Sequence, residues 1–247
     1  MPLLSILGEE IEAELILFDL DGTLLDASTR YRNLARARPE TIGRLVGGRA
    51  VEEWAKLSGV DKDTLEIDPQ GPLTRAPRRE DLAVASAAIY VSGYPWHAAR
   101  ELAERAYEEA DRLQDALYRP SLVKGAGEAL RSLKDAGFKL GIATNGESTS
   151  ASAMMKELGL LDLFDVVLGA DSVVEAKPAP EMVLLACERV GVPPSRALFV
   201  GDQQEDMRAG RAASVRAVVS VNNSEETVTG LADFSLDSVV DIRPARS

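Results

Sequence analysis

Short, unbroken runs of apolar residues recur along the chain and are typical of buried strands. A run that is apolar at every position, and not only at every second one, fits a strand covered on both faces of a parallel sheet. The runs occupy residues 15–18, 138–143, 164–168, 197–200 and 215–219, with a weaker one at 234–236. The pattern therefore predicts a parallel sheet of five or six strands.

Amphipathic segments alternate with these runs and predict helices. Glycine directly follows two of the segments, at Gly137 and Gly159, and Pro178 precedes a third, as is common at helix ends. The segments lie at residues 128–136, 148–158, 179–190 and 204–213. Strands that alternate with helices in this way predict an α/β fold with a doubly wound parallel sheet.

One long segment, residues 27–118, interrupts the alternation. It contains no run typical of a buried strand and is mostly helical in pattern, most clearly from 94 to 118. A connector rich in proline and glycine lies at 67–78. We therefore predict an α/β core made of residues 1–26 and 119–247, with an all-helical domain, residues 27–118, inserted into it.

The composition narrows the functional classes. The 247 residues include 28 Lys and Arg against 40 Asp and Glu, a net charge of −12. Such an acidic chain is a poor partner for nucleic acid, which requires clustered positive charge. The single cysteine, Cys187, excludes an internal disulfide framework. The single histidine, His97, argues against a multi-histidine metal site or a serine–histidine relay, so acid–base chemistry falls to other side chains.

The sequence also suggests where the protein acts. No apolar stretch approaches the ~20 residues of a membrane helix, so a membrane partner is not expected. The short apolar run at the N-terminus has no basic leader and is followed by glutamates, which is untypical of a signal peptide. We therefore expect a cytoplasmic protein, either a monomer or a homodimer.

Polar residues follow four of the predicted strands at the point where each ends. Ligands of open parallel sheets bind at the carboxyl ends of the strands, so these residues are expected to converge on one pocket. The set consists of Asp19 and Asp21 after the first strand, Thr144 and Asn145 after the second, Lys177 beyond the third, and Asp202 and Asp206 after the fourth.

This set of side chains favours one kind of chemistry. Several carboxylates crowded together are costly to keep ionised unless a cation lies among them, and hard oxygen ligands favour Mg²⁺. Lys177 is a compact positive charge suited to phosphate oxygens or to a nucleophilic carboxylate. The Asp-Gly-Thr turn at residues 21–23 presents backbone N–H groups that can face an anion. Together these features predict a magnesium-assisted site for phosphoryl transfer.

Four segments resemble the motifs of a known superfamily. FDLDGTLLD, ATNGE, the lysine of KPAPE and VGDQQEDMRAG are similar, in this order, to the four motifs of the haloacid dehalogenase (HAD) superfamily. The insertion directly after the first motif is similar to the small helical cap of its phosphatase-like members. The resemblance covers residues 12–26 and 119–238. It implies a Rossmann-like core and Mg²⁺-dependent hydrolysis of a small phosphorylated substrate, such as phosphoglycolate or a sugar phosphate.

The resemblance also implies catalytic roles for Asp19, Asp21, Thr144 and Lys177. Asp19 would be the nucleophile that forms an aspartyl-phosphate. Asp21 would protonate the leaving oxygen and later deprotonate the attacking water. Thr144 would bind the phosphoryl group with the help of the Asn145 backbone, and Lys177 would offset the charge of Asp19 and of the phosphate.

The metal would be held by Asp19, by the backbone carbonyl of Asp21, and by Asp202 and Asp206, again by resemblance. Gln203 departs from the pattern, because many relatives have Ser or Thr at this position. An amide can still form hydrogen bonds there, so we expect it to tune the activity without abolishing it.

Two other functions remain open. Asp21 favours cleavage of a phosphate ester over displacement of halide from carbon, because only the ester needs an acid for its leaving group. A phosphomutase similar to β-phosphoglucomutase would have every core motif seen here. A phosphate-binding module without catalytic activity could also use the same fold.

The inserted domain carries weaker signals. Arg49 follows two glycines, and its planar guanidinium suits a carboxylate or a phosphate, so it is our candidate for substrate binding. Residues 29–49 hold six arginines (30, 32, 36, 38, 44 and 49), which either steer an anionic substrate or form a solvated helix face. We expect the hydrophobic core of this domain to include Trp54, Tyr90, Tyr94 and Trp96, with a place in the substrate pocket as the alternative for one of them.

Overall fold

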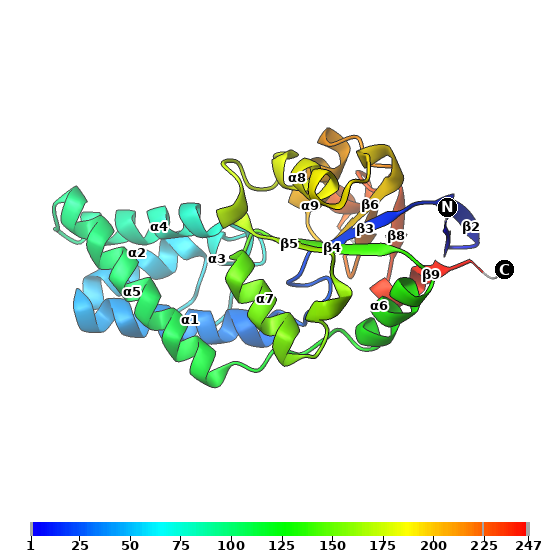
Figure 1. Ribbon diagram of the computed structural model, residues 1–247. Coiled ribbons are helices and arrows are strands. Elements are labelled where there is room, and N and C mark those ends of the chain that lie inside the picture. The colour runs from blue at the N-terminus through cyan, green and yellow to red at the C-terminus, as the bar shows by residue number, and fades with distance from the viewer. Residues whose placement is uncertain (1, 224, 246–247) are drawn as a thin grey trace. The chain divides into compact units, whose positions relative to one another are not determined.

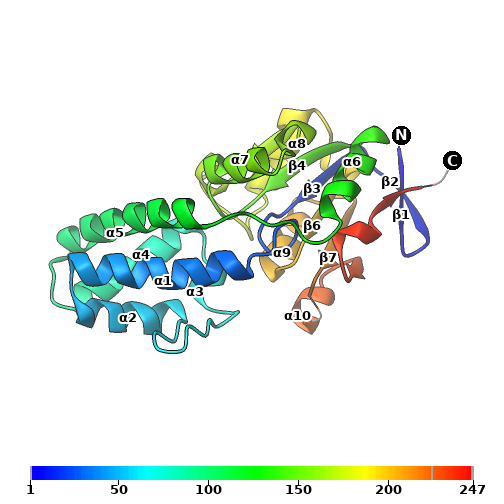
Figure 2. The same cartoon turned by 90° about the horizontal axis from the view of Figure 1, so that it is seen from below.

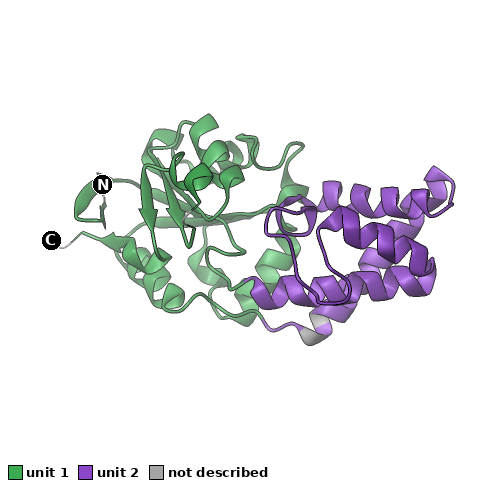
Figure 3. Ribbon diagram, turned by 180° about the vertical axis from the view of Figure 1, so that it is seen from behind, with its two compact units in different colours: residues 1–26, 120–247 green, residues 27–119 purple. Residues whose placement is uncertain are grey.

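The computed structural model describes residues 2–223 and 225–245, with all of their side chains except those at positions 115 and 117. Contacts between Cα atoms divide the chain into two units (Figure 3). Unit 1 contains residues 1–26 and 120–247, and unit 2 contains residues 27–119.

A six-stranded parallel sheet forms the centre of unit 1 (Figure 1). In spatial order its strands are β5 (Val166–Leu168), β4 (Lys139–Ala143), β3 (Leu15–Phe18), β6 (Ala197–Gly201), β7 (Ala217–Val221) and β8 (Phe234–Leu236). Every neighbouring pair is parallel. The predicted α/β fold with a doubly wound parallel sheet is confirmed, and each predicted strand lies within two residues of its expected bounds.

The central strand, β3, is buried at all four positions, as its unbroken apolar run predicts. Leu17 lies opposite Gly141 on one side and Phe199 on the other. A Cβ atom at Gly141 would lie 2.6 Å from Leu17 Cδ2 and 2.7 Å from Val166 Cγ1, so glycine is required for this close packing. The apolar runs therefore specify the middle of the sheet directly.

Helices connect the strands and cover the sheet. The principal ones are α6 (Ala126–Asp135), α7 (Ser148–Glu157), α8 (Glu181–Val190) and α9 (Gln204–Ala212), followed by the short α10 (Glu226–Thr229). Single 3₁₀ turns lie at Leu161–Leu163, Ala170–Ser172, Pro194–Arg196 and Val239–Asp241. Residues from α8 and α9 pack with those of the central strands in one hydrophobic cluster. Cys187 on α8 is 2% exposed within this cluster.

A second, three-stranded antiparallel sheet was not predicted from the sequence. It consists of β1 (Leu3–Ile6), β2 (Glu9–Glu12) and β9 (Arg243–Pro244), in the order β2-β1-β9. The turn between β1 and β2 places Leu7 at φ 51° and Gly8 at φ 87°, as a tight hairpin requires. Because β2 buries only Ile11, its sequence gives little alternating signal.

Unit 2 is built from helices (Figure 2). They are α1 (Ser28–Leu45), α2 (Gly48–Ser58), the short α3 (Pro72–Arg75), α4 (Arg78–Val91) and α5 (Trp96–Leu117). Helix α5 packs against α1 and α4. Helix α2 also packs against α1 and α4. Alanines line much of the core, which lets the helices approach closely around the fully buried Trp54 and Tyr107. None of the helices described in either unit is long and apolar enough to cross a membrane.

The prediction for the aromatic core of unit 2 is half correct. Trp54 is fully buried, and the partly buried Tyr94 packs against the same cluster. Tyr90 and Trp96 are 56% and 50% exposed, so their assignment to the core was wrong. Helix α4 ends just after Tyr90 and α5 begins at Trp96, and the two rings contact each other edge to face with centroids 6.1 Å apart.

A buried ion pair crosses the core of unit 2. Arg38 Nη1 lies 2.5 Å from Asp81 Oδ2, and both side chains are about 5% exposed. The guanidinium of Arg38 lies 4.3 Å from the centroid of the Tyr107 ring, a cation–π contact. The Tyr107 hydroxyl donates to Asp81 Oδ1 (3.0 Å) and accepts a hydrogen bond from Trp54 Nε1 (2.9 Å). Burial raises the pKa of Asp81, although Arg38 lowers it.

These contacts change the interpretation of the arginine-rich segment. Arg38 is directed into the core and paired with Asp81, and Arg44 forms an ion pair with Glu109. Two of the six arginines at 29–49 are therefore balanced by acids within unit 2. The local positive charge is smaller than the sequence suggests.

Breaking the buried pair should destabilise unit 2 strongly. Asp81→Ala leaves the Arg38 charge buried and unpaired, and we expect a loss of about 3–5 kcal/mol in the free energy of unfolding. The double variant Arg38→Met/Asp81→Leu removes both charges and should lose less than Asp81→Ala alone. Urea unfolding of the three proteins measures the difference. A double variant at least as unstable as the single one would contradict this account.

Candidate active site

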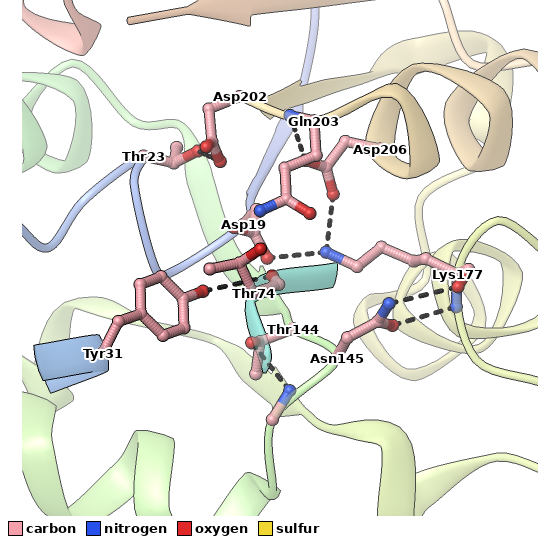
Figure 4. Close-up of polar contacts among 11 residues, drawn as sticks. Asp19, Thr23, Tyr31, Thr74, Thr144, Asn145, Lys177, Asp202, Gln203 and Asp206 are labelled. Atoms are coloured by element: carbon pink, nitrogen blue, oxygen red, sulfur yellow. Dashed lines mark hydrogen bonds and ion pairs between the residues drawn. The ribbon is translucent and has the colours of Figure 1, made fainter. Parts of the chain in front are cut away.

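Six of the predicted site residues lie close together at the carboxyl edge of the large sheet: Asp19, Thr144, Asn145, Lys177, Asp202 and Asp206 (Figure 4). Backbone hydrogen bonds continue past the strand ends there. The Asp19 N–H donates to Val200 O at 2.8 Å, and the Thr144 N–H donates to Leu168 O at 3.1 Å. Both residues are thereby fixed by the neighbouring strand. The first position after a strand can thus carry a polar side chain while its backbone remains part of the sheet.

Lys177 joins two of the acids. Its Nζ donates to Asp19 Oδ1 and to Asp206 Oδ1, each at 2.6 Å, and its side chain is 2% exposed. Burial alone would lower the pKa of Lys177, but the charges of Asp19 and Asp206 outweigh this effect and raise it. Lys177 is therefore a fixed positive charge and not a base.

Asn145 holds Lys177 in place. Its side-chain Nδ2 donates to Lys177 O at 3.1 Å, and its Oδ1 accepts from the Lys177 N–H at 3.0 Å. One amide thus pairs with both backbone groups of a residue 32 positions further along the chain. The Asn145 side chain is therefore occupied by the backbone of Lys177. The predicted substrate contact is left to the backbone of Asn145.

The pKa of Asp19 is raised to about 6. Burial is the largest cause, since it disfavours the ionised carboxylate, and Lys177 offsets part of it. The nearby Asp206 raises the pKa further. A cation beside this carboxylate would favour the charged form that a nucleophile requires.

Three carboxylates converge at this edge of the sheet. One oxygen each from Asp19, Asp202 and Asp206 lies within 4.8 Å of the others. Burial, and then the charges of Asp19 and Asp206, raise the pKa of Asp202 well above its usual range. If all three acids are ionised, their negative charge exceeds the single positive charge of Lys177. This set of hard oxygen donors, with its excess of negative charge, fits a divalent cation such as Mg²⁺.

Two glycines permit this crowding. A Cβ atom at Gly201 would lie 2.4 Å from the Cβ and carboxyl atoms of Asp206, and one at Gly22 would lie 2.4 Å from Asp202 Oδ2. Gly22 also has φ 87°, a conformation that other residues rarely adopt. Asp206 is held further by its Oδ2, which accepts from the Gln203 N–H at 2.9 Å at the start of α9.

The remaining predicted residues are placed as follows. Asp21 is 9% exposed in the turn after β3, and its carboxylate is not one of the three that converge. The buried Thr144 accepts a hydrogen bond from the Gly146 N–H at its Oγ1 (3.1 Å). Arg49 is exposed in the first turn of α2 in unit 2, and its role in substrate binding stays a prediction.

Sequence reasoning missed three polar residues at this edge. Thr23 Oγ1 donates to Asp202 Oδ1 at 3.1 Å. Asn223 Nδ2 donates to Asp202 O at 2.6 Å, and Asn222 Nδ2 donates to Gly22 O at 2.8 Å. Both asparagines directly follow β7, which ends at the same edge as β3 and β6. The same strand-end criterion that identified the acids would have identified them.

Comparison with known proteins shows the family of the chain. The model of the haloacid dehalogenase-like hydrolase family matches residues 13–214. The chain is 28% identical over 243 residues to a phosphoglycolate phosphatase of Nitrosococcus oceani, covering 94% of this chain and 96% of the relative. It is 30% identical over 211 residues to an N-acetylmuramic acid 6-phosphate phosphatase of Pseudomonas aeruginosa, covering 81% and 78%.

The fold is also similar to solved structures. The crystal structure of a predicted phosphoglycolate phosphatase from Haemophilus somnus matches with a TM-score of 0.68 and 21% identity, covering 94% of this chain and 96% of the other. At this identity the match supports the fold alone. The family model matches most of the chain, so the chain belongs to the haloacid dehalogenase-like hydrolases.

Replacing one of the crowded acids should stabilise the metal-free protein. Because the folded protein raises the pKa of Asp202, the protonated carboxyl favours the fold at low pH, and this contribution is lost as the pH rises. Asp202→Asn cannot ionise, so in EDTA at pH 7.5 its Tm should exceed that of the wild type by a few degrees. The difference should shrink towards pH 4.

The matched control is Asp162→Asn, which removes one exposed carboxylate from unit 1. Thermal unfolding of the three proteins in EDTA across this pH range tests the prediction. If Asp162→Asn produced an equal gain, net charge and not local crowding would be the cause.

Proposed function

We propose that this protein is a phosphatase that hydrolyses a small phosphate monoester through an aspartyl-phosphate on Asp19, with Mg²⁺ as its cofactor. The observation that carries this proposal is the buried Asp19 carboxylate, held by Lys177 beside Asp202 and Asp206. The relatives named above, a phosphoglycolate phosphatase and an N-acetylmuramic acid 6-phosphate phosphatase, support the same class of reaction.

In the first step, an oxygen of Asp19 forms a bond to phosphorus as the bond to the ester oxygen breaks. The protonated carboxyl of Asp21 gives its proton to the departing oxygen, so an alcohol leaves. In the second step, Asp21 takes a proton from a water molecule that attacks the same phosphorus. Phosphate is released and Asp19 regains its carboxylate.

Lys177 contributes fixed charge to both steps. Its ammonium contacts Asp19 directly and keeps its proton, so it offsets the negative charge that the phosphoryl group brings to the nucleophile. The second contact, to Asp206, limits the rotation of the ammonium group. Because Asn145 fixes the Lys177 backbone, this charge is preorganised before substrate arrives.

Thr144 and the backbone of Asn145 would bind the phosphoryl oxygens. Since Thr144 Oγ1 already accepts from the Gly146 N–H, its own O–H is directed elsewhere and can donate to substrate. The Asn145 amide side chain is engaged by Lys177, which leaves its backbone N–H for this purpose. Both donors would contact oxygen and not the leaving group, so they suit any phosphate monoester.

The cofactor would be held by carboxylate oxygens of Asp19, Asp202 and Asp206 and by the backbone carbonyl of Asp21. When bound, Mg²⁺ supplies positive charge that neutralises these acids and the transferred group. The raised pKa values of Asp19 and Asp202 support this assignment, since burial and the neighbouring acids disfavour both carboxylates and a bound cation would favour them.

We propose that residues 27–118 act as a cap that excludes water and selects the leaving group. The substrate would be phosphoglycolate, a sugar phosphate or a compound of similar size. We further propose that the protein acts in the cytoplasm as a monomer or homodimer.

Asp19→Asn should abolish turnover. An amide is a very poor nucleophile towards phosphorus, so release of inorganic phosphate should fall by at least about 10³-fold, whereas Asp162→Asn should retain wild-type activity. Phosphate release from p-nitrophenyl phosphate, phosphoglycolate, N-acetylmuramic acid 6-phosphate and hexose phosphates measures this, with Mg²⁺ and with EDTA. Binding of phosphate without turnover of any ester would favour the non-catalytic alternative.

A hexose 1-phosphate separates hydrolysis from phosphoryl transfer to a second hydroxyl. We expect inorganic phosphate and free hexose, because the proposed second step uses water. Analysis of the products by ³¹P NMR distinguishes the outcomes. Accumulation of hexose 6-phosphate would identify a phosphomutase instead.

We retain Arg49 as a proposed substrate-binding residue. Arg49→Ala should raise KM about tenfold for phosphoglycolate, whose carboxylate a guanidinium can bind, and change KM for p-nitrophenyl phosphate little. Arg36, another exposed arginine of unit 2, provides the control variant Arg36→Ala. Steady-state kinetics with both substrates decide the matter, and equal effects of the two variants would exclude a specific role for Arg49.

A further inference from the structure

Two consecutive asparagines follow β7 at the edge of the sheet that carries the acids. Asn222 Nδ2 donates to the carbonyl of Gly22 at 2.8 Å, and Asn223 Nδ2 donates to the carbonyl of Asp202 at 2.6 Å. Gly22 belongs to the loop after β3, and Asp202 to the loop after β6. One short segment therefore forms hydrogen bonds to both of the loops that supply the carboxylates.

The same segment is anchored independently on its other side. The Asn222 N–H donates to Leu236 O of β8 at 3.2 Å, and Asn223 Oδ1 accepts from the Glu225 N–H at 2.8 Å, just before α10. Asn222 has φ 52°, a left-handed conformation that asparagine tolerates better than most residues. The two amides thus extend from a fixed support towards the acidic loops.

Asp202 is the residue that most needs such support. Its carboxylate lies beside two other acids, with one oxygen of each within 4.8 Å of the others. Thr23 holds its side chain, Asn223 holds its backbone carbonyl, and Asn222 holds Gly22. Gly22 itself lies so close to Asp202 Oδ2 that a Cβ would not fit between them. These contacts fix the separation of two loops that are 179 residues apart in sequence.

We propose that Asn222 and Asn223 are positioning residues, which hold the loops of Asp19 and Asp202 at the separation that a divalent cation requires. The inference deepens the proposed function, since it concerns the same cation site. Outer contacts of this kind typically change metal affinity by about 10–100-fold when they are removed. We therefore expect the two amides to affect metal binding more than the chemical step.

The variants are chosen to remove the donors and keep the loop. Asn222→Gly preserves the left-handed backbone and deletes the amide that reaches Gly22. Asn223→Ser retains a hydroxyl that can accept from the Glu225 N–H but is too short to reach Asp202 O. Gln204→Ala is the control, because Gln204 Nε2 donates to Thr227 O at 3.3 Å and thus also joins α9 to the segment after β7.

Metal affinity is measured on the full chain without substrate, by calorimetric titration with Mg²⁺ and by EPR of free Mn²⁺, and Tm is measured in EDTA. Asn222→Gly and Asn223→Ser should each raise the Kd for metal about tenfold, whereas Gln204→Ala should leave it unchanged. With saturating Mg²⁺, kcat should remain within about threefold of the wild type, so the loss appears in the metal requirement.

A purely structural role would lower the Tm in EDTA and leave the Kd for metal unchanged, and this result in both variants would overturn the inference. A tenfold loss of affinity in Gln204→Ala would overturn it as well, because the effect would not be specific to the asparagines. Failure of the proposed function is a separate outcome, in which the wild type binds metal but releases phosphate from no ester. Each asparagine variant tests its own contact, so one that folds poorly leaves the other decisive.

Discussion

The site depends on one buried cation, the ammonium of Lys177. It lies between Asp19 and Asp206 with 2.6 Å contacts to each, and the Lys177 side chain is 2% exposed. Without it, the three acids would meet with no ammonium beside them among the described residues, and keeping them ionised at this buried edge would be costly. With it, the remaining negative charge is suited to a divalent ion and too large for the protein to balance alone.

The fold brings this arrangement about through the geometry of parallel strands. Neighbouring strands in register end at one level, so residues 19, 144 and 202 meet although they are far apart in sequence. The backbone of Asp19 remains hydrogen-bonded to the adjacent strand, which fixes the position of this carboxylate relative to the sheet. Glycine at positions 22 and 201 then lets the acidic loops approach more closely than any side chain would allow.

Much of this could be predicted from the sequence, because a strand buried on both faces carries an unbroken apolar run and its polar end residue stands out. The acids after the first and fourth strands were predicted in this way, whereas Lys177 lies nine residues beyond the end of β5. The hairpin of β1 and β2 was missed, since one inward residue, Ile11, gives no periodicity, and Leu7-Gly8 is not a common turn pair. The prediction for Tyr90 and Trp96 failed because aromatic spacing does not show where a helix ends.

Contacts between distant polar groups could not be predicted at all. Nothing in the spacing indicates that the Asn145 amide pairs with the backbone of Lys177, or that Arg38 enters the helical core to meet Asp81. Such partners are decided by tertiary packing, and the amino-acid types alone are equally compatible with exposure to solvent. The roles of Asn222 and Asn223 belong to the same group, although their position after β7 was a usable signal.

The packing of Cys187 has a practical consequence. It is the only cysteine in the sequence, it lies under the sheet, and burial raises the pKa of its thiol to about 11, so little thiolate forms at neutral pH. We therefore expect the native thiol to react slowly with maleimides and nitroxide reagents. Cysteines introduced in pairs, one on each unit, would take spin labels or fluorophores without removal of the native thiol. The distances between such labels, with and without a phosphate analogue, would follow any opening and closing in solution.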